Sequence, residues 1–280
     1  MKRPGRTLAE VLAVLAAAAI AFPLYWMVLS ALKPESEVIS SDPKPWTLQP
    51  SLDNFTRVLT TQGFGRYFLN SVLVALVVVA LSLLISFLAA TALTRLRFRG
   101  RTLLLVMLLV AQMVPVEALT IPMFFLMRSV GDAVPAFGLN QLGGLVLVHL
   151  AFSLPFAIWM LRGFVAAVPV ELEEAATLDG ASRQRFLWQV LFPLVAPGLV
   201  ATSVLSFIHA WNDFLFAKTF IISASENQTL PLALLAFFKP DQNDWGAIMA
   251  GSTLMTVPVL VFFVLVQRRL VSGLAGAVKG

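Results

Sequence analysis

The sequence predicts an all-α protein that crosses a membrane several times. Three observations support this fold class: 59% of the 280 residues are hydrophobic, only 12% are charged, and the mean hydropathy is +0.86. A soluble domain carries about 25% charged residues, and the few charges present here could not cover the surface of a globule of this length. We therefore expect lipid to be the solvent for much of the chain.

Six stretches with little or no charge are long enough to cross a bilayer, which takes roughly 20 apolar residues. The predicted spans are 11–32, 69–92, 103–124, 142–162, 195–218 and 247–267. The first has the basic flank and alanine-rich run of a secretory signal, but its apolar run continues through Trp26 and Leu29, which favours a retained helix. We expect residues 1–280 to form a single transmembrane domain.

The basic residues predict the orientation of these spans, because Lys and Arg concentrate in cytoplasmic loops. With the N-terminus inside, 13 of the 20 basic residues fall on the cytoplasmic side. They are Lys2, Arg3, Arg6, Arg95, Arg97, Arg99, Arg101, Arg162, Arg183, Arg185, Arg268, Arg269 and Lys279. We therefore predict N-in, C-in topology, and we interpret the net charge of +5 as topology and not as a nucleic-acid site.

The segment 168–193, between the fourth and fifth predicted spans, has the pattern of two short helices joined by a glycine turn. Pro169 suits a first helical turn, and the three glutamates that follow complement the helix dipole. Gly180 is placed to end the first helix with a positive φ. A second helix can begin around Ser182 and end near Pro193.

The first of these helices offers a surface for a cytosolic partner. Ala175 and Ala176 give it low relief, and Leu172 and Leu178 are apolar knobs. On this pattern alone, a loop that merely links two spans is an equally good interpretation.

The spacing within this segment resembles the EAA loop of binding-protein-dependent ABC importer permeases. Glu174-Ala175-Ala176 is followed after three residues by Gly180, and after nine more by Val190, with Phe192-Pro193 completing the register. The family consensus has Ile and Leu where this chain has Val190 and Phe192.

Other segments resemble the carbohydrate branch of that family, in particular the maltose-type second permease. They are Leu32-Lys33-Pro34-Glu35, Asn70-Ser71, Arg95-Leu-Arg-Phe-Arg-Gly-Arg101, Trp211-Asn-Asp-Phe214 and the C-terminal segment from Gln267. The resemblance implies a MetI-like type I ABC importer permease fold with six transmembrane helices, in the bacterial cytoplasmic membrane.

The resemblance also implies partners and a coupling site. We expect a second related permease, two ATPase subunits or a homodimer of one, and an extracytoplasmic substrate-binding protein. ATP and Mg²⁺ would bind to the ATPase, since this chain has no Gly-x4-Gly-Lys-Ser/Thr phosphate loop. The expected ATPase-coupling residues are Glu174, Ala175, Ala176, Leu178, Asp179, Gly180 and Pro193.

Polar residues inside the predicted spans are candidates for the translocation pathway or its gate, because each is costly in hydrocarbon. They are Glu117, His149, His209, Trp211, Asn212 and Asp213. Asp213 lies one helical turn after His209, so the two can share a face; an interhelical tie is a slightly better interpretation than direct contact with sugar. Trp211 could stack on a sugar or anchor at the interface. Glu117 lies between two prolines, in a gate or in a kink that only shapes packing.

The basic C-terminal tail is a candidate contact with the ATPase through Arg268, Arg269, Gly273 and Lys279, the alternative being a basic end held by anionic lipid. An ion-driven secondary transporter would need paired membrane acids and usually inverted repeats, and neither is evident. No carboxylate pair, His-x3-His or Ser/His/Asp set predicts a catalytic, cofactor or metal site, so a membrane enzyme is disfavoured.

Overall fold

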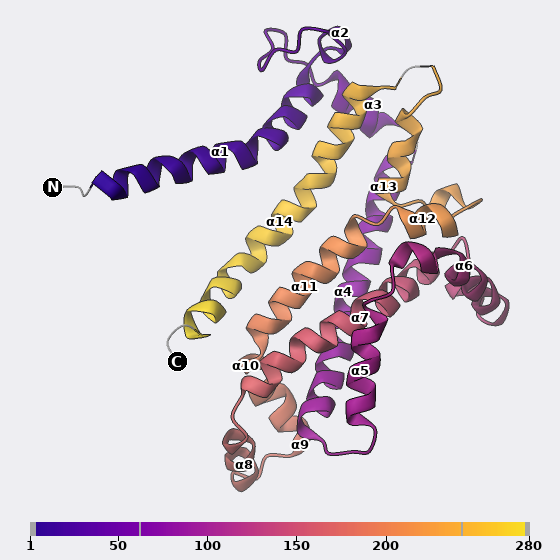
Figure 1. The fold of residues 1–280 in the computed structure, drawn as a ribbon. Coiled ribbons are helices and arrows are strands. Elements are labelled where there is room, and N and C mark those ends of the chain that lie inside the picture. Colours follow the sequence, from indigo (N-terminus) through magenta and orange to yellow (C-terminus); the bar gives the residue numbers. More distant parts are fainter. Residues whose placement is uncertain (1–3, 62, 242, 278–280) are drawn as a thin grey trace. The chain divides into compact units, whose positions relative to one another are not determined.

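The computed structural model describes residues 4–61, 63–241 and 243–277, and all the regular structure in these ranges is helical (Figure 1). Side chains are described from residue 10 to residue 267 within them. The contacts divide the chain into two compact units. One takes in the chain up to Gly65 together with Ala233–Pro258, and the other takes in Arg66–Leu232 together with the chain from Val259.

Among the described residues, four helices are long and apolar enough to cross a membrane. They are α1 (Pro4–Leu32), α4 (Phe64–Arg95), α7 (Leu142–Ala167) and α14 (Trp245–Ala277). Two bent helix pairs also meet the length and hydropathy requirements, so the number rises to six if each pair is one span. This range includes the predicted number of spans.

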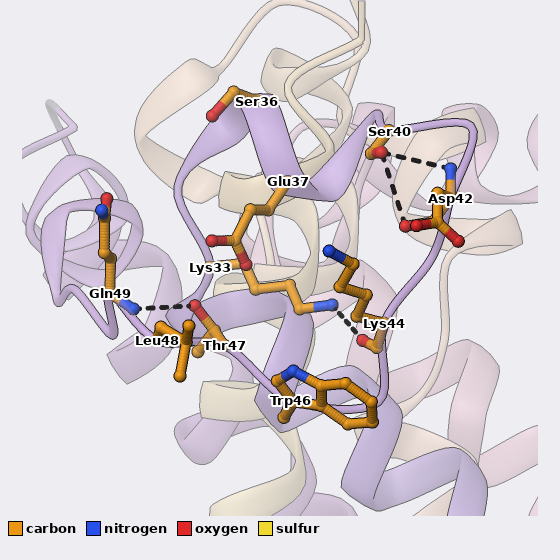
Figure 2. A pocket seen from close by; sticks show the side chains of 10 residues that line it. All are labelled: Lys33, Ser36, Glu37, Ser40, Asp42, Lys44, Trp46, Thr47, Leu48 and Gln49. Atoms are coloured by element: carbon orange, nitrogen blue, oxygen red, sulfur yellow. Dashed lines mark hydrogen bonds between the residues drawn. The ribbon is translucent and has the colours of Figure 1, made fainter.

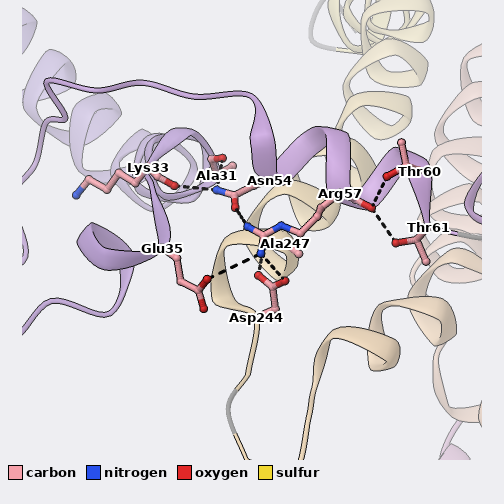
Figure 3. Close-up of polar contacts among 9 residues, drawn as sticks. All are labelled: Ala31, Lys33, Glu35, Asn54, Arg57, Thr60, Thr61, Asp244 and Ala247. Atoms are coloured by element: carbon pink, nitrogen blue, oxygen red, sulfur yellow. Dashed lines mark hydrogen bonds and ion pairs between the residues drawn. The ribbon is translucent and has the colours of Figure 1, made fainter.

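The first unit is held together by polar contacts at the end of α1 and the start of α14 (Figure 3). Buried Asn54, on α3 (Asp53–Thr60), donates hydrogen bonds to the carbonyls of Ala31 and Lys33 at 2.9 and 2.8 Å. These carbonyls at the end of α1 would otherwise lack partners. Arg57 donates to Asp244 at 3.0 Å, and Asp244 accepts from the Ala247 N–H in the first turn of α14.

The segment 33–49, which includes the short helix α2 (Glu35–Val38), forms a small polar hollow of about 270 Å³ (Figure 2). The Lys33 ammonium lies in this hollow and donates to the Lys44 carbonyl at 2.5 Å. The same ammonium lies 5.2 Å from the centre of the Trp26 ring, a cation–π contact. These contacts give this segment a defined conformation.

The second unit contains most of the helices. After α4 they are α5 (Arg101–Ala111), α6 (Val116–Ala133), η1 (Pro135–Phe137), α7, α8 (Glu171–Leu178), α9 (Arg183–Arg185), the π-helical segment η2 (Phe186–Leu191), α10 (Phe192–Leu194), α11 (Ala196–Trp211), α12 (Leu215–Phe220) and η3 (Ser225–Asn227). Next in sequence come α13 (Leu230–Ala233) and η4 (Leu234–Phe237), which lead into the first unit.

Two predicted spans are interrupted in the structure. The prediction of one helix over 103–124 is wrong, because α5 ends at Ala111, α6 begins at Val116, and the pair bends by 105°. Pro115 explains the break, since it lacks an N–H and disfavours helical geometry in the residue before it.

The prediction over 195–218 is also too long. α11 ends at Trp211, and the chain bends by 72° between Arg183–Leu194 and Ala196–Trp211. Pro197 explains the second bend, because its ring would collide with the carbonyl four residues earlier, at Pro193.

Candidate functional site

The loop 168–193 folds into the predicted helix, glycine turn and second helix. α8 ends at Leu178, and Gly180 adopts a φ of +76°. The Ser182 hydroxyl then accepts a hydrogen bond from the Arg185 N–H and caps α9. The second helix runs on as η2 and α10 to Leu194, so Pro193 lies inside it and is exposed.

α8 has two distinct faces. Glu171, Glu174, Ala175 and Leu178 follow the i, i+3, i+4, i+7 spacing of one helix face, and all four are exposed. Leu178 is 89% exposed, so almost its whole side chain is available to another molecule. We call these four residues the outward stripe. Asp179 and Gly180, which follow, are exposed as well.

The other face of α8 packs against the helices of the second unit. Ala176 is half-buried and contacts the buried apolar cluster, whereas Ala175 lies on the outward stripe. The two alanines expected to form one docking surface therefore lie on different faces of α8. The cluster joins α4, α7, η2 and α11 through Phe87, Ala90, Leu161, Val165, Val168, Phe186, Leu191, Val195 and Leu199. α8 therefore has one face in the protein and one face open.

A separate cavity of about 710 Å³ lies among α5, α6, α7 and α11, beside the break before Pro115. Its lining is mainly apolar, with polar groups from Gln112, Ser153, Ser206 and His209. The Ser153 hydroxyl is buried and has no hydrogen-bond partner in the structure. An apolar hollow with a few converging polar groups is the usual form of a small-molecule site.

His209 connects this cavity to a buried polar cluster. Its ring lies 5.9 Å from that of His149, edge to face, and His149 is 1% exposed. The His149 Nε2 lies 3.6 Å from a carboxylate oxygen of Asp213. Asp213 also accepts hydrogen bonds from the N–H groups of Phe216 and Ala217, so it caps the first turn of α12. The predicted His149, His209 and Asp213 thus come together.

The remaining predicted pathway residues lie elsewhere. Trp211 is 1% exposed, stacks on Phe207 and meets Phe68 edge-on, so it has no open face on which a sugar could stack. Glu117 is exposed in the first turn of α6, and Asn212 is exposed at the end of α11. Neither lines the cavity.

The candidate tail contacts fall outside what the structure describes. Lys279 lies outside the described residues. Arg268, Arg269 and Gly273 lie in the part of α14 after residue 267, for which only the backbone is described. Across the described part of the chain, no group of three or more His, Asp or Glu side chains is arranged to hold a metal ion.

Sequence reasoning missed the polar lining of the cavity. Ser153 and Ser206 lie on α7 and α11, Gln112 directly follows α5, and nothing in their local sequence marks them. Pro115 was the available signal, because it lies at the helix break beside the cavity.

Comparison with known proteins places the chain in a family. Residues 82–276 match the family model described as "Binding-protein-dependent transport system inner membrane component". The diacetylchitobiose uptake system permease protein DasC of Streptomyces coelicolor is 41% identical over the whole of both chains. The trehalose transport system permease protein SugB of Mycobacterium tuberculosis is 35% identical over 92% of each chain. The chain belongs to this family of inner-membrane transport components.

A solved structure shows the same fold. A bacterial ABC transporter involved in import of the acidic polysaccharide alginate contains a chain with a TM-score of 0.78 and 23% identity, covering 96% of this chain and 98% of that one. The protein is accordingly a MetI-like permease component of the inner membrane.

Proposed function

We propose that this chain is a permease subunit of an ATP-driven ABC importer for a sugar or oligosaccharide. The outward stripe of α8 is the observation that carries the proposal, because an alanine, two acids and an almost fully exposed leucine lie on one open face of a helix whose other face packs against α4, α7 and α11. The relatives that transport diacetylchitobiose and trehalose support a carbohydrate as cargo.

The proposal includes the topology and the domain organisation. Residues 1–280 form a single permease domain with six spans, α5 with α6 counting as one and α11 as another, and both termini lie in the cytoplasm. Segment 168–193 then lies on the cytoplasmic side as a coupling loop. The excess of basic residues on that side supports this orientation.

The same proposal assigns the energy source and the partners to other chains. A related permease completes the pathway, two ATPase subunits (or a homodimer of one) bind ATP and Mg²⁺, and a binding protein delivers sugar from outside. This chain binds no cofactor and hydrolyses nothing. A related structure was solved with a substrate-bound periplasmic protein, which supports the last of these partners.

Transport would proceed by alternating access. Closure of the ATPase pair on ATP displaces α8 through its outward stripe, and the packed face of α8 passes the displacement to α4, α7 and α11. Rigid shifts of packed helices of this kind are a common form of switching. The coupling residues are those predicted from the loop, with Glu174, Ala175 and Leu178 making direct contact.

The cavity beside the α5–α6 break is the proposed part of the pathway in this chain. His209 lines the cavity, and its ring packs against that of His149, which in turn contacts Asp213. Glu117, in the first turn of α6, and Asn212, at the end of α11, complete the proposed pathway residues. We assign Trp211 a packing role. We also propose that the tail, with Arg268, Arg269, Gly273 and Lys279, reaches the ATPase.

Reversing the charge of one residue in the outward stripe tests the function. In proteoliposomes containing the whole assembly, Glu174→Lys should lower sugar uptake about tenfold or more, because it places a cation where an acid contacts the partner. Asp132→Lys, the same change at an exposed residue of α6, should transport normally. Uptake without the ATPase subunits, or normal uptake by Glu174→Lys, would overturn the proposal.

A further inference from the structure

Arg95 is the last residue of α4, and its side chain is buried where α4, α7 and α8 meet. The side chain is only 9% exposed. Its Nη2 donates to the carbonyl of Val168 at 2.7 Å and to that of Val165 at 3.3 Å. α7 ends at Ala167, so the Val168 carbonyl lies just past the helix, and the Val165 carbonyl in its last turn otherwise accepts only a 3.3 Å hydrogen bond from the Val168 N–H. The guanidinium therefore caps α7 at the end where the helix dipole favours a cation.

The same guanidinium also contacts α8. The Arg95 Nε lies 3.7 Å from a carboxylate oxygen of Glu173, which belongs to the first turn of α8 on the side away from the outward stripe. This distance is an ion-pair contact, longer than a hydrogen bond, and the buried Nε–H has no hydrogen-bond acceptor. A movement of α8 by less than about 1 Å would convert the contact into a charge-assisted hydrogen bond.

A role in membrane topology does not account for this placement. Arg97 and Arg99 follow in the same loop and are exposed, as a charge that only marks the cytoplasmic side can be. Burial of a charged group is costly unless it is paired and hydrogen-bonded. Arg95 is both, and its partners belong to two other helices, so its position points to a role in joining them.

Two kinds of contact hold α8 in place. Ala176 packs on the apolar cluster, and this contact is not directional. Arg95 adds hydrogen bonds and charge, whose geometry fixes the first turn of α8 relative to the ends of α4 and α7. Loss of Arg95 would leave α8 packed but less firmly oriented.

We propose that Arg95 is a positioning residue that fastens α8 to the ends of α4 and α7, so that displacement of α8 by a partner reaches the membrane helices. The inference rests on the proposed coupling function of α8. The inference adds a coupling residue about 80 positions before the EAA loop. This residue contacts the face of α8 opposite the outward stripe.

The test measures sugar transported per ATP hydrolysed by the complete assembly in proteoliposomes. Arg95→Gln should lower this ratio about tenfold, since it removes both the charge and the two-carbonyl cap. Arg95→Lys retains the charge but has one nitrogen in place of the separate Nη2 and Nε contacts, so it should lower the ratio about threefold. Arg97→Gln is the matched control and should leave the ratio unchanged.

A spin label provides a readout that does not depend on transport. The chain has no cysteine, so Thr177→Cys carries a single label on an exposed residue of α8 that lies outside the outward stripe. In the assembled complex, Arg95→Gln should make this label more mobile, and Arg97→Gln should not. If Arg95 is needed only for folding, Arg95→Gln should lower the yield of assembled complex, and the complex that does assemble should have an unchanged ratio and unchanged label mobility. That result would overturn the inference.

If the Arg95→Gln complex does not assemble, Glu173→Gln tests the same role of Arg95. It removes the ion pair and leaves the α7 cap intact, and it should lower the ratio about threefold. An unchanged ratio in Glu173→Gln or in an assembled Arg95→Gln, together with uncoupling by Glu174→Lys, would overturn the role of Arg95 and leave the proposed function standing. If Glu174→Lys also had no effect, the proposed function would fail as well.

Discussion

Gly180 controls the direction in which the chain leaves α8. Its φ of +76° lies in the left-handed region, and an added Cβ would meet no atom within 4 Å. The requirement for glycine is therefore conformational and not steric. A β-branched residue pays about 1–2 kcal/mol for this conformation, whereas asparagine tolerates it.

This difference yields a prediction at the residue scale. Gly180→Val should reorient or loosen the turn between α8 and α9 and lower the sugar transported per ATP about fivefold or more. Gly180→Asn has a side chain of similar size and should retain most of the coupling. The ratio measured in proteoliposomes checks both variants. Equal losses in the two would mean that size at position 180 matters and not its backbone conformation.

The turn at Gly180 could be predicted because its signals are local in the sequence. The role of a residue such as Arg95 could not, because its contacts are distant in the sequence. Gly180 and Ser182 act on atoms within a few residues of themselves, so their sequence neighbourhood is sufficient to place them. Arg95 acts across 70 or more residues, on the carbonyls of Val165 and Val168. From the sequence alone, Arg95 cannot be distinguished from the neighbouring arginines that only mark topology.

The contact between α7 and α11 depends on one small residue. A Cβ at Gly198 would lie 2.4 Å from the ring of Phe164, well inside contact distance. Gly163, the preceding residue on α7, has nothing within 4 Å of its Cβ position. The two glycines therefore separate the effect of helix propensity from that of packing.

At the element scale we predict opposite outcomes for the same substitution. Gly198→Ala should destabilise the protein by about 1–3 kcal/mol, because Phe164 must leave its place. Gly163→Ala should be neutral or stabilise it by up to about 1 kcal/mol, since alanine is the better helix former. Thermal unfolding in detergent checks this. If the midpoint of Gly198→Ala matched that of the unmodified chain, close approach of α11 to α7 could not be what requires glycine.

The existence of the helices was predictable, but their continuity was not. Hydropathy marks 103–124 as apolar throughout, and Pro115 and Pro122 lie within it. The helix breaks at Pro115 and continues through Pro122, which is inside α6. Membrane helices accommodate a proline when neighbouring groups satisfy the freed carbonyl, so the outcome at each site depends on tertiary contacts that a linear pattern does not contain.

At the scale of the whole molecule, much of the described surface is apolar. The 18-residue window that defines the span in α1 contains no buried residue, and its exposed residues are apolar on every side, as in Val11, Leu15 and Ile20. A helix that is apolar all round is stable in water only inside a core. An apolar environment must therefore cover α1, and the inner membrane in which its family is found provides one.

The proposed topology can be tested with single cysteines, because the chain has none of its own. Gln49, Phe98 and Gln184 are exposed and lie in three different connections between spans. With six spans and cytoplasmic termini, a membrane-impermeant maleimide added to intact spheroplasts should label Gln49→Cys alone. Phe98→Cys and Gln184→Cys should react only after permeabilisation, which also serves as the control for reactivity. Labelling of the opposite set would mean that the orientation is reversed. If Phe98→Cys and Gln184→Cys were labelled from opposite sides, the bent pair of α5 and α6 would be re-entrant, because α7 alone would then cross between them.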